Sequence, residues 1–218
     1  MKGFIDTLRN IWNIEDLRAR ILTTLGFILI YRVGSYIALP GINPAELESL
    51  QQQGQQGMIG LINIFAGGAF SRASIFALGI MPYITASIVI QLLTLAVPYF
   101  QKLQKEGESG RRQINQITRF LTVIITLFQS AGYIANLYYT SRGAIQIDQT
   151  LFYLSSAVCL TAGTIFVMWM GERITEKGIG NGISLLIMIG IVANLPLALV
   201  NELASRTEGG GGGLIPFV

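Results

Sequence analysis

The feature that most limits how this chain can fold is the gathering of its apolar residues into long uncharged runs. These runs lie near 21–39, 73–97, 117–139, 151–171 and 183–200. A helix needs about 20 mostly apolar residues to cross the hydrocarbon core of a bilayer, and each run comes close to that length. Charged residues make up only 12% of the 218 residues, against about 25% in soluble domains. We therefore expect an all-α, polytopic transmembrane bundle with five spans.

The composition also argues against most catalytic and metal-binding chemistry. The chain has no histidine and a single cysteine, so zinc sites, Ser/His triads and disulfide frameworks lack their partners. Cys159 lies in an apolar run, where free cysteine usually packs as a small hydrophobe. An intramembrane hydrolase would need a Ser/Lys, Asp/Asp or metal constellation, and the spans show none. We expect neither an enzyme nor a cofactor.

Basic residues indicate which connections face the cytoplasm, because cytoplasmic loops near spans are enriched in Lys and Arg. Eleven of them fall on one side: Lys2, Arg9, Arg18, Arg20, Lys102, Lys105, Arg111, Arg112, Arg119, Arg173 and Lys177. The other four are Arg32, Arg72, Arg142 and Arg206. We expect a cytoplasmic N-terminus. Arg32 lies late in the first span, where it either reaches outward past Tyr36 to the interface or takes part in gating.

The start of the chain is not typical of a removable signal peptide, because acidic residues are mixed with basic ones and no small-residue cleavage site follows. Phe4, Leu8, Ile11 and Trp12 recur at helical spacing. This pattern predicts a cytoplasmic amphipathic helix within residues 1–20 that lies on the membrane surface. The alternative is a frayed cytosolic tail.

One apolar run is too short to span. Residues 58–70 read MIGLINIFAGGAF, thirteen residues that include a Gly–Gly pair. Such a run favours a re-entrant half-length helix, and irregular backbone at membrane depth must be buried in protein or line a cavity. The alternative is an external loop anchored at the membrane surface.

Two isoleucine pairs at helical spacing are candidates for an apolar constriction. Pro82 lies inside the run 73–97 and predicts a bend in that span. Ile80 and Ile84 flank this proline on one face, and Ile187 and Ile191 share a face in the last run. Rings of apolar side chains can block ions by dewetting. Ordinary helix packing is the alternative for both pairs.

The sequence GIGNG at 178–182 resembles a phosphate-binding glycine loop only superficially, because no strand precedes it and an apolar span follows. We expect its glycines to form a tight helix start, capped by Asn181 or Ser184.

Three stretches together resemble the SecY family of protein translocase channel subunits. They are INIFAGGAFSRASIFALGIMPYITASIVIQLL at 62–93, GESGRRQINQITR at 107–119 and GERITEKGIGNGISLLI at 171–187. YRVG at 31–34 and LPGIN at 39–43 extend the resemblance toward the N-terminus. The resemblance implies a passive protein-conducting pore that moves secretory proteins across, and membrane proteins into, the bacterial plasma (inner) membrane.

The resemblance also implies an organisation into two five-helix halves, of which residues 21–204 would supply the first. Residues 205–218 would then hold an external hinge loop and the start of a truncated sixth span. The glycine run Gly209–Gly213 suits such a hinge because it resists regular structure, with an engineered linker as the alternative.

The family's functional elements carry over to particular residues. The pore ring would be Ile80, Ile84, Ile187 and Ile191. The plug, a small re-entrant half-helix, would be Leu61, Ile62, Asn63, Ile64, Phe65, Ala66, Gly67, Gly68, Ala69, Phe70, Ser71 and Arg72. One side of the lateral gate would include Thr85, Ser87 and Gln91, for which ordinary helix contacts are the alternative. Cytoplasmic partner contacts would be Lys102, Lys105, Arg111, Arg112, Arg173 and Lys177, or these residues are simply solvated.

The implied partners are SecE, SecG, the SecA motor or a ribosome, signal sequences, nascent polypeptides and membrane lipid. Nucleic acid would enter only through contact with ribosomal RNA. The rival function is a secondary transporter of small solutes, which also uses broken helices. Transporters usually carry intramembrane charge, and the apolar centres of the last four spans contain no Asp or Glu.

Overall fold

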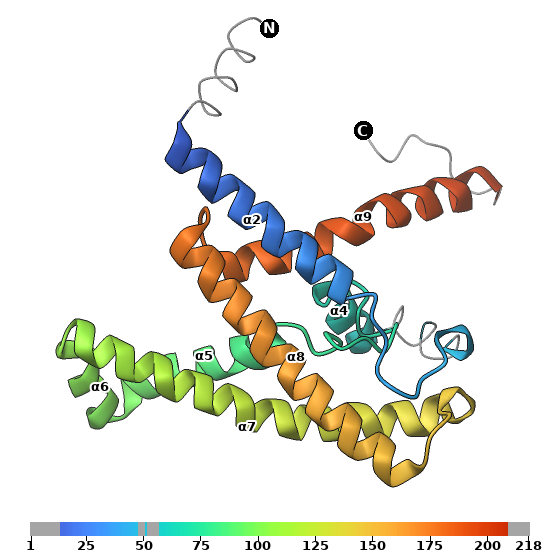
Figure 1. The fold of residues 1–218 in the computed structure, drawn as a ribbon, viewed down its shortest axis with the longest axis horizontal. Coiled ribbons are helices and arrows are strands. Elements are labelled where there is room, and N and C mark those ends of the chain that lie inside the picture. Colours follow the sequence, from blue (N-terminus) through green and yellow to red (C-terminus); the bar gives the residue numbers. More distant parts are fainter. Residues whose placement is uncertain (1–13, 48–50, 52–56, 209–218) are drawn as a thin grey trace, which may run out of the picture.

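The computed structural model describes residues 14–47, 51 and 57–208, and this part of the chain is built from helices (Figure 1). The long helices are α2 (Glu15–Gly34), α5 (Met81–Ala96), α7 (Glu108–Thr140), α8 (Gln149–Lys177) and α9 (Gly182–Glu208). The short ones are η1 (Pro44–Glu46), α4 (Gly57–Phe65), α6 (Pro98–Lys105) and η2 (Arg142–Ala144). Extended pairing in the described residues is limited to two isolated bridges, Ala38 with Ser74 and Ile42 with Ile145. The all-α prediction is confirmed.

Two predicted regions fall partly outside the described residues. The amphipathic helix expected within 1–20 is described only from residue 14, and there the chain already belongs to α2, which begins at Glu15. The glycine run Gly209–Gly213 and the expected start of a sixth span also lie outside the described part of the chain.

The helices differ in how well they meet the requirements of a membrane span. Within the described residues, α7 and α8 are each long and apolar enough to cross a bilayer, and α5 with α6 would form a third, broken span. The apolar part of α9, Gly182–Pro196, is shorter. The 20-residue α2 carries Glu15 and Asp16 in its first turn and Arg32 in its last. A count of five spans therefore stays a prediction.

The predicted bend at Pro82 is wrong. The helix of the second span begins at Met81, so Pro82 occupies its first turn, where the missing N–H has no intrahelical partner to lose. The bend lies instead at Pro98, where the axes of α5 and α6 meet at 96°. Val97 before this proline is extended, as expected of a residue that precedes proline.

Two hydrophobic clusters form the core of the described residues. One contains Leu39, Phe70, Leu78, Tyr133 and Phe152, and it surrounds the irregular chain between α4 and α5. The other contains Tyr31, Phe76, Ile80, Met170 and Leu186, and it joins α2, α8 and α9 to the start of α5. The long helices therefore pack around a central region that is itself not helical.

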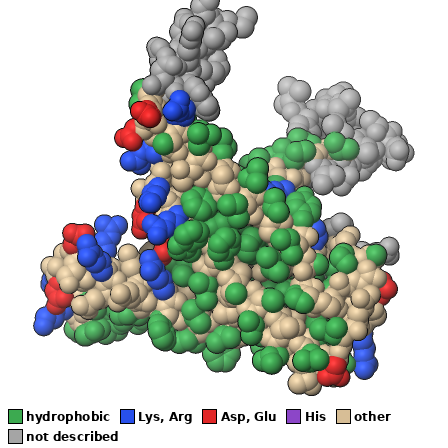
Figure 2. Space-filling model, viewed as in Figure 1, with side chains coloured by type: hydrophobic (Ala, Val, Ile, Leu, Met, Phe, Trp, Pro, Cys, Tyr) green, Lys and Arg blue, Asp and Glu red, His purple; other side chains and the backbone are tan. Residues whose placement is uncertain are grey.

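The basic residues predicted to share one side gather at one end of the helices where the structure describes them; Lys2 and Arg9 lie outside the described residues. Figure 2 shows Lys and Arg side chains over α6, the start of α7 and the end of α8. Arg20 at the start of α2 donates to the Gly178 carbonyl after α8 at 3.4 Å. At the opposite end, Arg32 and Arg72 lie beside Tyr36. The alternation of charge along the sequence thus corresponds to two ends of the folded chain.

Candidate functional site

Three of the four predicted ring isoleucines lie together. Ile80 is 3% exposed and belongs to the cluster of Tyr31 and Phe76. Ile84 on α5 and Ile187 on α9 are half-buried and pack against the same cluster. We call Ile80, Ile84 and Ile187 the apolar waist. Helices far apart in the sequence thus place branched apolar side chains at one point.

Ile191, the fourth predicted ring residue, is more exposed than the other three. It is 39% exposed and lies one helical turn beyond Ile187 on α9. Its neighbour Gly190 faces the segment after α4, because a Cβ added there would stand 2.7 Å from the Phe65 carbonyl oxygen. Ile191 therefore lies at the level of the predicted plug.

The predicted re-entrant segment, residues 58–70, runs from the short helix α4 into an irregular chain that continues from residue 66 to residue 80. Gly67 and Gly68 have φ angles of 65° and 81°, a region that glycine adopts without steric cost. Ala73 also has a positive φ of 46°. The Gly–Gly pair thus ends the helix and turns the chain back into the protein.

Side chains satisfy the backbone of this irregular chain. The buried Tyr133 hydroxyl on α7 donates to the Phe70 carbonyl at 2.8 Å. Arg72 donates from Nη2 to the Gly67 carbonyl at 2.8 Å and from Nε to the Ser35 carbonyl at 3.3 Å. Asn63 accepts from the Ser71 N–H at 3.0 Å. Such bonds matter because unpaired backbone groups are costly away from water.

The irregular chain also packs directly against helix backbones. A Cβ at Gly163 of α8 would collide with the carbonyl oxygen of Ile75. Ala66, Ala69 and Ala73 are at most 2% exposed. The external-loop alternative fails for residues 66–80, which lie in the protein interior, whereas Leu61 and Ile64 of α4 are 57% and 41% exposed.

Arg32 lies beside Tyr36 and also contacts the predicted plug. It donates from Nη1 to the Gly67 carbonyl at 3.3 Å, so it contacts the same oxygen as Arg72. Its guanidinium also lies 5.8 Å from the centre of the Tyr36 ring. Arg32 thus connects α2 to the predicted plug.

The predicted gate residues bond within their own helix. Thr85 donates to the Met81 carbonyl at 3.1 Å, and Gln91 donates to the Ser87 hydroxyl at 3.3 Å. Thr85 and Gln91 are exposed and Ser87 is half-buried. These bonds are the ordinary helix contacts named as the alternative, although Thr85 also lines a cavity of about 330 Å³ with Phe70 and Tyr133.

The predicted partner contacts lie at the basic end. Lys102, Lys105, Arg111, Arg112 and Lys177 are exposed, and Arg173 is half-buried. Arg111 and Arg112 line a polar cavity of about 580 Å³ that reaches Tyr83 on α5. Asn181 caps α9, since its side chain accepts from the N–H groups of Ile183 and Ser184 at 3.0 and 3.2 Å. The predicted tight helix start is confirmed.

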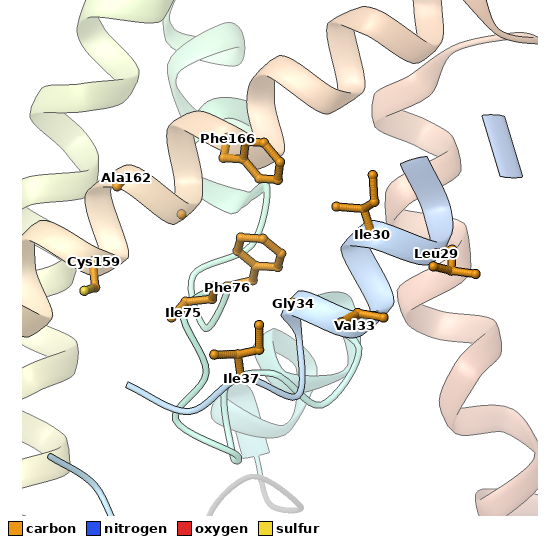
Figure 3. Close-up of a pocket in the computed structure, with 11 residues that line it drawn as sticks. Leu29, Ile30, Val33, Gly34, Ile37, Ile75, Phe76, Cys159, Ala162 and Phe166 are labelled. Atoms are coloured by element: carbon orange, nitrogen blue, oxygen red, sulfur yellow. The ribbon is translucent and has the colours of Figure 1, made fainter. Parts of the chain in front are cut away.

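A further cavity lies between α2 and α8. It is a groove of about 550 Å³, lined by apolar side chains such as Leu29, Val33 and Phe166, with Phe76 and Ile75 from the irregular chain behind them (Figure 3). Gly34 lets the backbone of α2 approach the Phe76 ring in the wall of this groove, since a Cβ there would collide with that ring. Cys159 is half-buried in this wall, as its apolar surroundings predicted.

Sequence reasoning missed three contacts that position the site. They are Tyr133 on the Phe70 carbonyl, Gly163 against Ile75, and the pair of Arg119 and Glu172 between α7 and α8. Only the last leaves a signal in the sequence, because charges of opposite sign face each other at the same end of two adjacent spans. The other two depend on where the irregular chain runs.

Comparison with known sequences gives a consistent family. The SecY family model matches residues 74–218. The protein translocase subunit SecY of Vibrio cholerae is 47% identical over 196 residues, which cover 90% of this chain and 44% of that protein. The Escherichia coli K12 subunit is also 47% identical, over 89% of this chain and 44% of its own length. The Pseudomonas aeruginosa subunit is 45% identical over 95% of this chain and 46% of its own length.

Two solved structures share the fold. Sec61 in the canine ribosome-channel complex from the endoplasmic reticulum aligns with a TM-score of 0.58 and 20% identity, over 88% of this chain and 42% of that one. A protein-conducting channel aligns with a TM-score of 0.57 and 21% identity, also over 88% of this chain and 42% of that one. The chain spans somewhat less than half the length of the curated relatives it matches. With its apolar helices and these relatives, it is a membrane protein that belongs to the SecY family.

Proposed function

We propose that this chain forms one half of a passive protein-conducting channel for translocating secretory proteins across, and inserting membrane proteins into, the bacterial plasma (inner) membrane. The observation that carries the proposal is the apolar waist, where Ile80, Ile84 and Ile187 meet beside a buried re-entrant segment. The 47% identity to protein translocase subunits supports the same activity.

The waist suits a polypeptide better than a solute. Apolar side chains offer ions no substitute for their hydration shell, so a narrow apolar ring blocks water and ions by dewetting. The waist isoleucines can part around an extended chain and close behind it, since they are held by packing rather than by directed bonds. The apolar centres of the last four predicted spans contain no Asp or Glu that would bind a small charged substrate.

The segment from Leu61 to Arg72 is proposed as the plug that seals the resting channel. Its inner side is tied to the protein by the Gly67 carbonyl and by Phe70. The exposed face of α4 is apolar, with Leu61, Ile64 and Phe65 at 57%, 41% and 36% exposure. We assign this face to contact with the second half of the channel, because solvent exposure of such a patch is unfavourable.

Helices α5 and α7 together are proposed as one side of the lateral gate, the seam through which signal sequences and nascent membrane segments reach lipid. Thr85 and Gln91 are exposed on α5, so their side chains are available to hydrogen-bond across a closed seam. Each has a bond within its own helix that it keeps when the seam opens.

The proposed partners follow from the two ends of the chain. The basic end, with Lys102, Lys105, Arg111 and Arg112, would face the cytoplasm together with the N-terminus and contact the SecA motor or a ribosome, including its RNA. A structural relative was solved in a ribosome-channel complex. SecE would hold the two halves together, with SecG alongside.

The direct test is photocrosslinking in the complete channel. Photoreactive residues are placed at Ile84, Ile187 and Ile191, and at Phe128 as a matched control, because Phe128 is 77% exposed on α7 and lies outside the waist. A stalled secretory precursor should label from Ile84 and Ile187 but not from Phe128. Labelling at Ile191 should require displacement of the plug. Labelling of the waist by a small solute and never by the precursor would favour the transporter alternative.

A further inference from the structure

Another groove lies between α7 and α8 on the face of α8 that bears Ile165 and Trp169. It has a volume of about 320 Å³, and its walls are apolar, with Phe120 from α7 and Ile165 and Met168 from α8. Trp169 lies in the wall and is 41% exposed. At one end the groove is closed by Arg119 and Glu172. The cavity is thus apolar along its length and charged at one end.

The charged end contains both signs of charge at close range. Arg119 donates from Nε and Nη2 to the two carboxylate oxygens of Glu172 at 2.9 and 2.7 Å. A guanidinium has five N–H donors, so this fork leaves donors for a further acceptor. Arg173 lies 5.6 Å from the centre of the Trp169 ring and pairs with Glu176 at 3.0 Å.

This end lies where α8 leaves the hydrocarbon. The helix has 29 residues and is therefore about 43 Å long at 1.5 Å per residue, longer than the apolar core of about 30 Å. Its long apolar run ends at Met168, Trp169 and Met170, and Glu172 and Arg173 follow after Gly171. The one later apolar residue of the helix, Ile174, is buried. Tryptophan is enriched at this depth because its ring is amphipathic. The charged rim therefore lies at headgroup level and the groove at acyl-chain level.

We propose that the α7–α8 groove is a phospholipid site that selects a zwitterionic lipid with a primary ammonium headgroup, of the phosphatidylethanolamine class. One acyl chain lies in the groove along Phe120 and Ile165. The phosphate accepts hydrogen bonds from Arg119 or Arg173, and the ammonium donates to Glu172. A choline headgroup has no N–H to donate to Glu172, so the carboxylate gains less from it.

The pairing of charges favours this lipid over an anionic one. Each arginine at the rim already has a carboxylate partner, Glu172 or Glu176, so the rim carries little net charge to attract an anion. A headgroup with one positive and one negative group instead matches the alternating arginine and glutamate side chains of the rim. The α2–α8 groove offers an internal contrast, because its lining residues are all uncharged (Figure 3).

The test uses Trp169 as a reporter, because brominated acyl chains quench tryptophan on contact. In the complete channel, Trp12 and the tryptophans of the second half are replaced by Phe, and the protein is placed in phosphatidylcholine vesicles. A small fraction of brominated phosphatidylethanolamine, phosphatidylcholine or phosphatidylglycerol is then added. The matched control moves the reporter to the uncharged groove, with Ile30→Trp in a Trp169→Phe background.

We expect the ethanolamine lipid to quench Trp169 at about fivefold lower mole fraction than the choline lipid. Glu172→Gln should remove this preference, and Arg173→Gln should weaken the binding of all three lipids alike, seen as weaker quenching. The reporter at position 30 should not distinguish the headgroups. Equal quenching of Trp169 by the ethanolamine and choline lipids, stronger quenching by the glycerol lipid, or a preference that survives Glu172→Gln would each overturn the proposal.

Discussion

Two regions of the molecule solve the same problem, the pairing of backbone groups at membrane depth, in opposite ways. In α7 and α8, which run for 33 and 29 residues, the peptide groups between the two ends bond within their own helix. Between residues 66 and 80 the chain is irregular: turns supply some of its backbone bonds, and the Gly67 and Phe70 carbonyls also accept from side chains on α2, α7 and the segment itself. The helices carry their own stability, whereas the irregular chain depends on its neighbours.

This difference in backbone pairing indicates which segments can be displaced at low free-energy cost. Displacing a helix such as α7 would break extensive packing with α5 and α8 but no backbone bonds of its own. Displacing the proposed plug breaks a small set of directed contacts, chiefly those on the Gly67 and Phe70 carbonyls. Segments held in this way open at lower free energy than helices in a packed core. The proposed plug, which would have to leave and return, is held by such a small set of directed contacts.

The largest effect is expected where a helix touches the irregular chain directly. Gly163→Ala should destabilise the complete channel by about 2–4 kcal/mol, because the added methyl collides with the Ile75 carbonyl. Thermal unfolding in detergent measures the change. Gly132→Ala on α7 is the control, since no atom lies within 4 Å of its Cβ position, and it should stabilise by up to about 1 kcal/mol. Equal effects of the two changes would contradict the packing described.

A smaller loss is expected from the buried tyrosine that supports the plug. Tyr133→Phe removes the 2.8 Å bond to the buried Phe70 carbonyl and leaves that oxygen only the Ala73 N–H at 3.2 Å, which should cost about 0.5–1.5 kcal/mol. Hydrogen exchange of the 66–80 amides should rise with little change in α7 itself. Tyr138→Phe removes a hydroxyl that bonds to exposed Gln149 and should be nearly neutral. Protection that stays unchanged in Tyr133→Phe would mean that the hydroxyl does not hold this segment.

Loss of the arginine contact should affect plug position more than global stability. Arg72→Gln removes the bonds to the Gly67 and Ser35 carbonyls, worth about 1 kcal/mol for a half-exposed group. A fluorophore on α4 should then report a larger displaced population, whereas Arg142→Gln, at an exposed position, should not change it. An unaltered α4 signal in Arg72→Gln would show that the plug is held by packing alone.

The smallest effect is expected for charges that hold only the surface of a helix. Arg112→Gln breaks an ion pair with Glu108 whose side chains are 77% and 83% exposed, so unfolding should change by less than about 0.5 kcal/mol. Arg119→Gln breaks the pair that joins α7 to α8, with Glu172 only 21% exposed, and should cost more. A reversal of this order would mean that the α7–α8 contact does not depend on that bridge.

The sequence predicted the helices where periodicity and apolarity are local properties. The runs that became α7 and α8 were long and uncharged, and the Gly–Gly pair marked the end of α4. Pro82 misled because a proline in the first turn and one in the interior look alike until the helix start is known. Pro98, which does break the helix, lies beyond the predicted end of that span.

The residues of the candidate site also fall into two groups, those that the sequence identified and those that depend on the path of irregular backbone. Ile80, Ile84 and Ile187 were identified through family resemblance, and the structure brings these three together. Ile191 shares the helical spacing of Ile187 but is more exposed, and its neighbour Gly190 lies against Phe65, because spacing gives a face of a helix and not a position along its axis. The contacts of Tyr133, Arg32 and Gly163 could not be read from the sequence, since they depend on the path of irregular backbone.

The central claim is that the apolar waist closes the passage to ions, and conductance of the complete channel in a planar bilayer tests it most directly. Ile84→Gly combined with Ile187→Gly should raise the resting conductance, with Ile80→Gly adding to it, whereas Val89→Gly on the exposed side of α5 should not. A resting conductance that stays at the level of the unaltered channel after the waist isoleucines are removed would contradict the account.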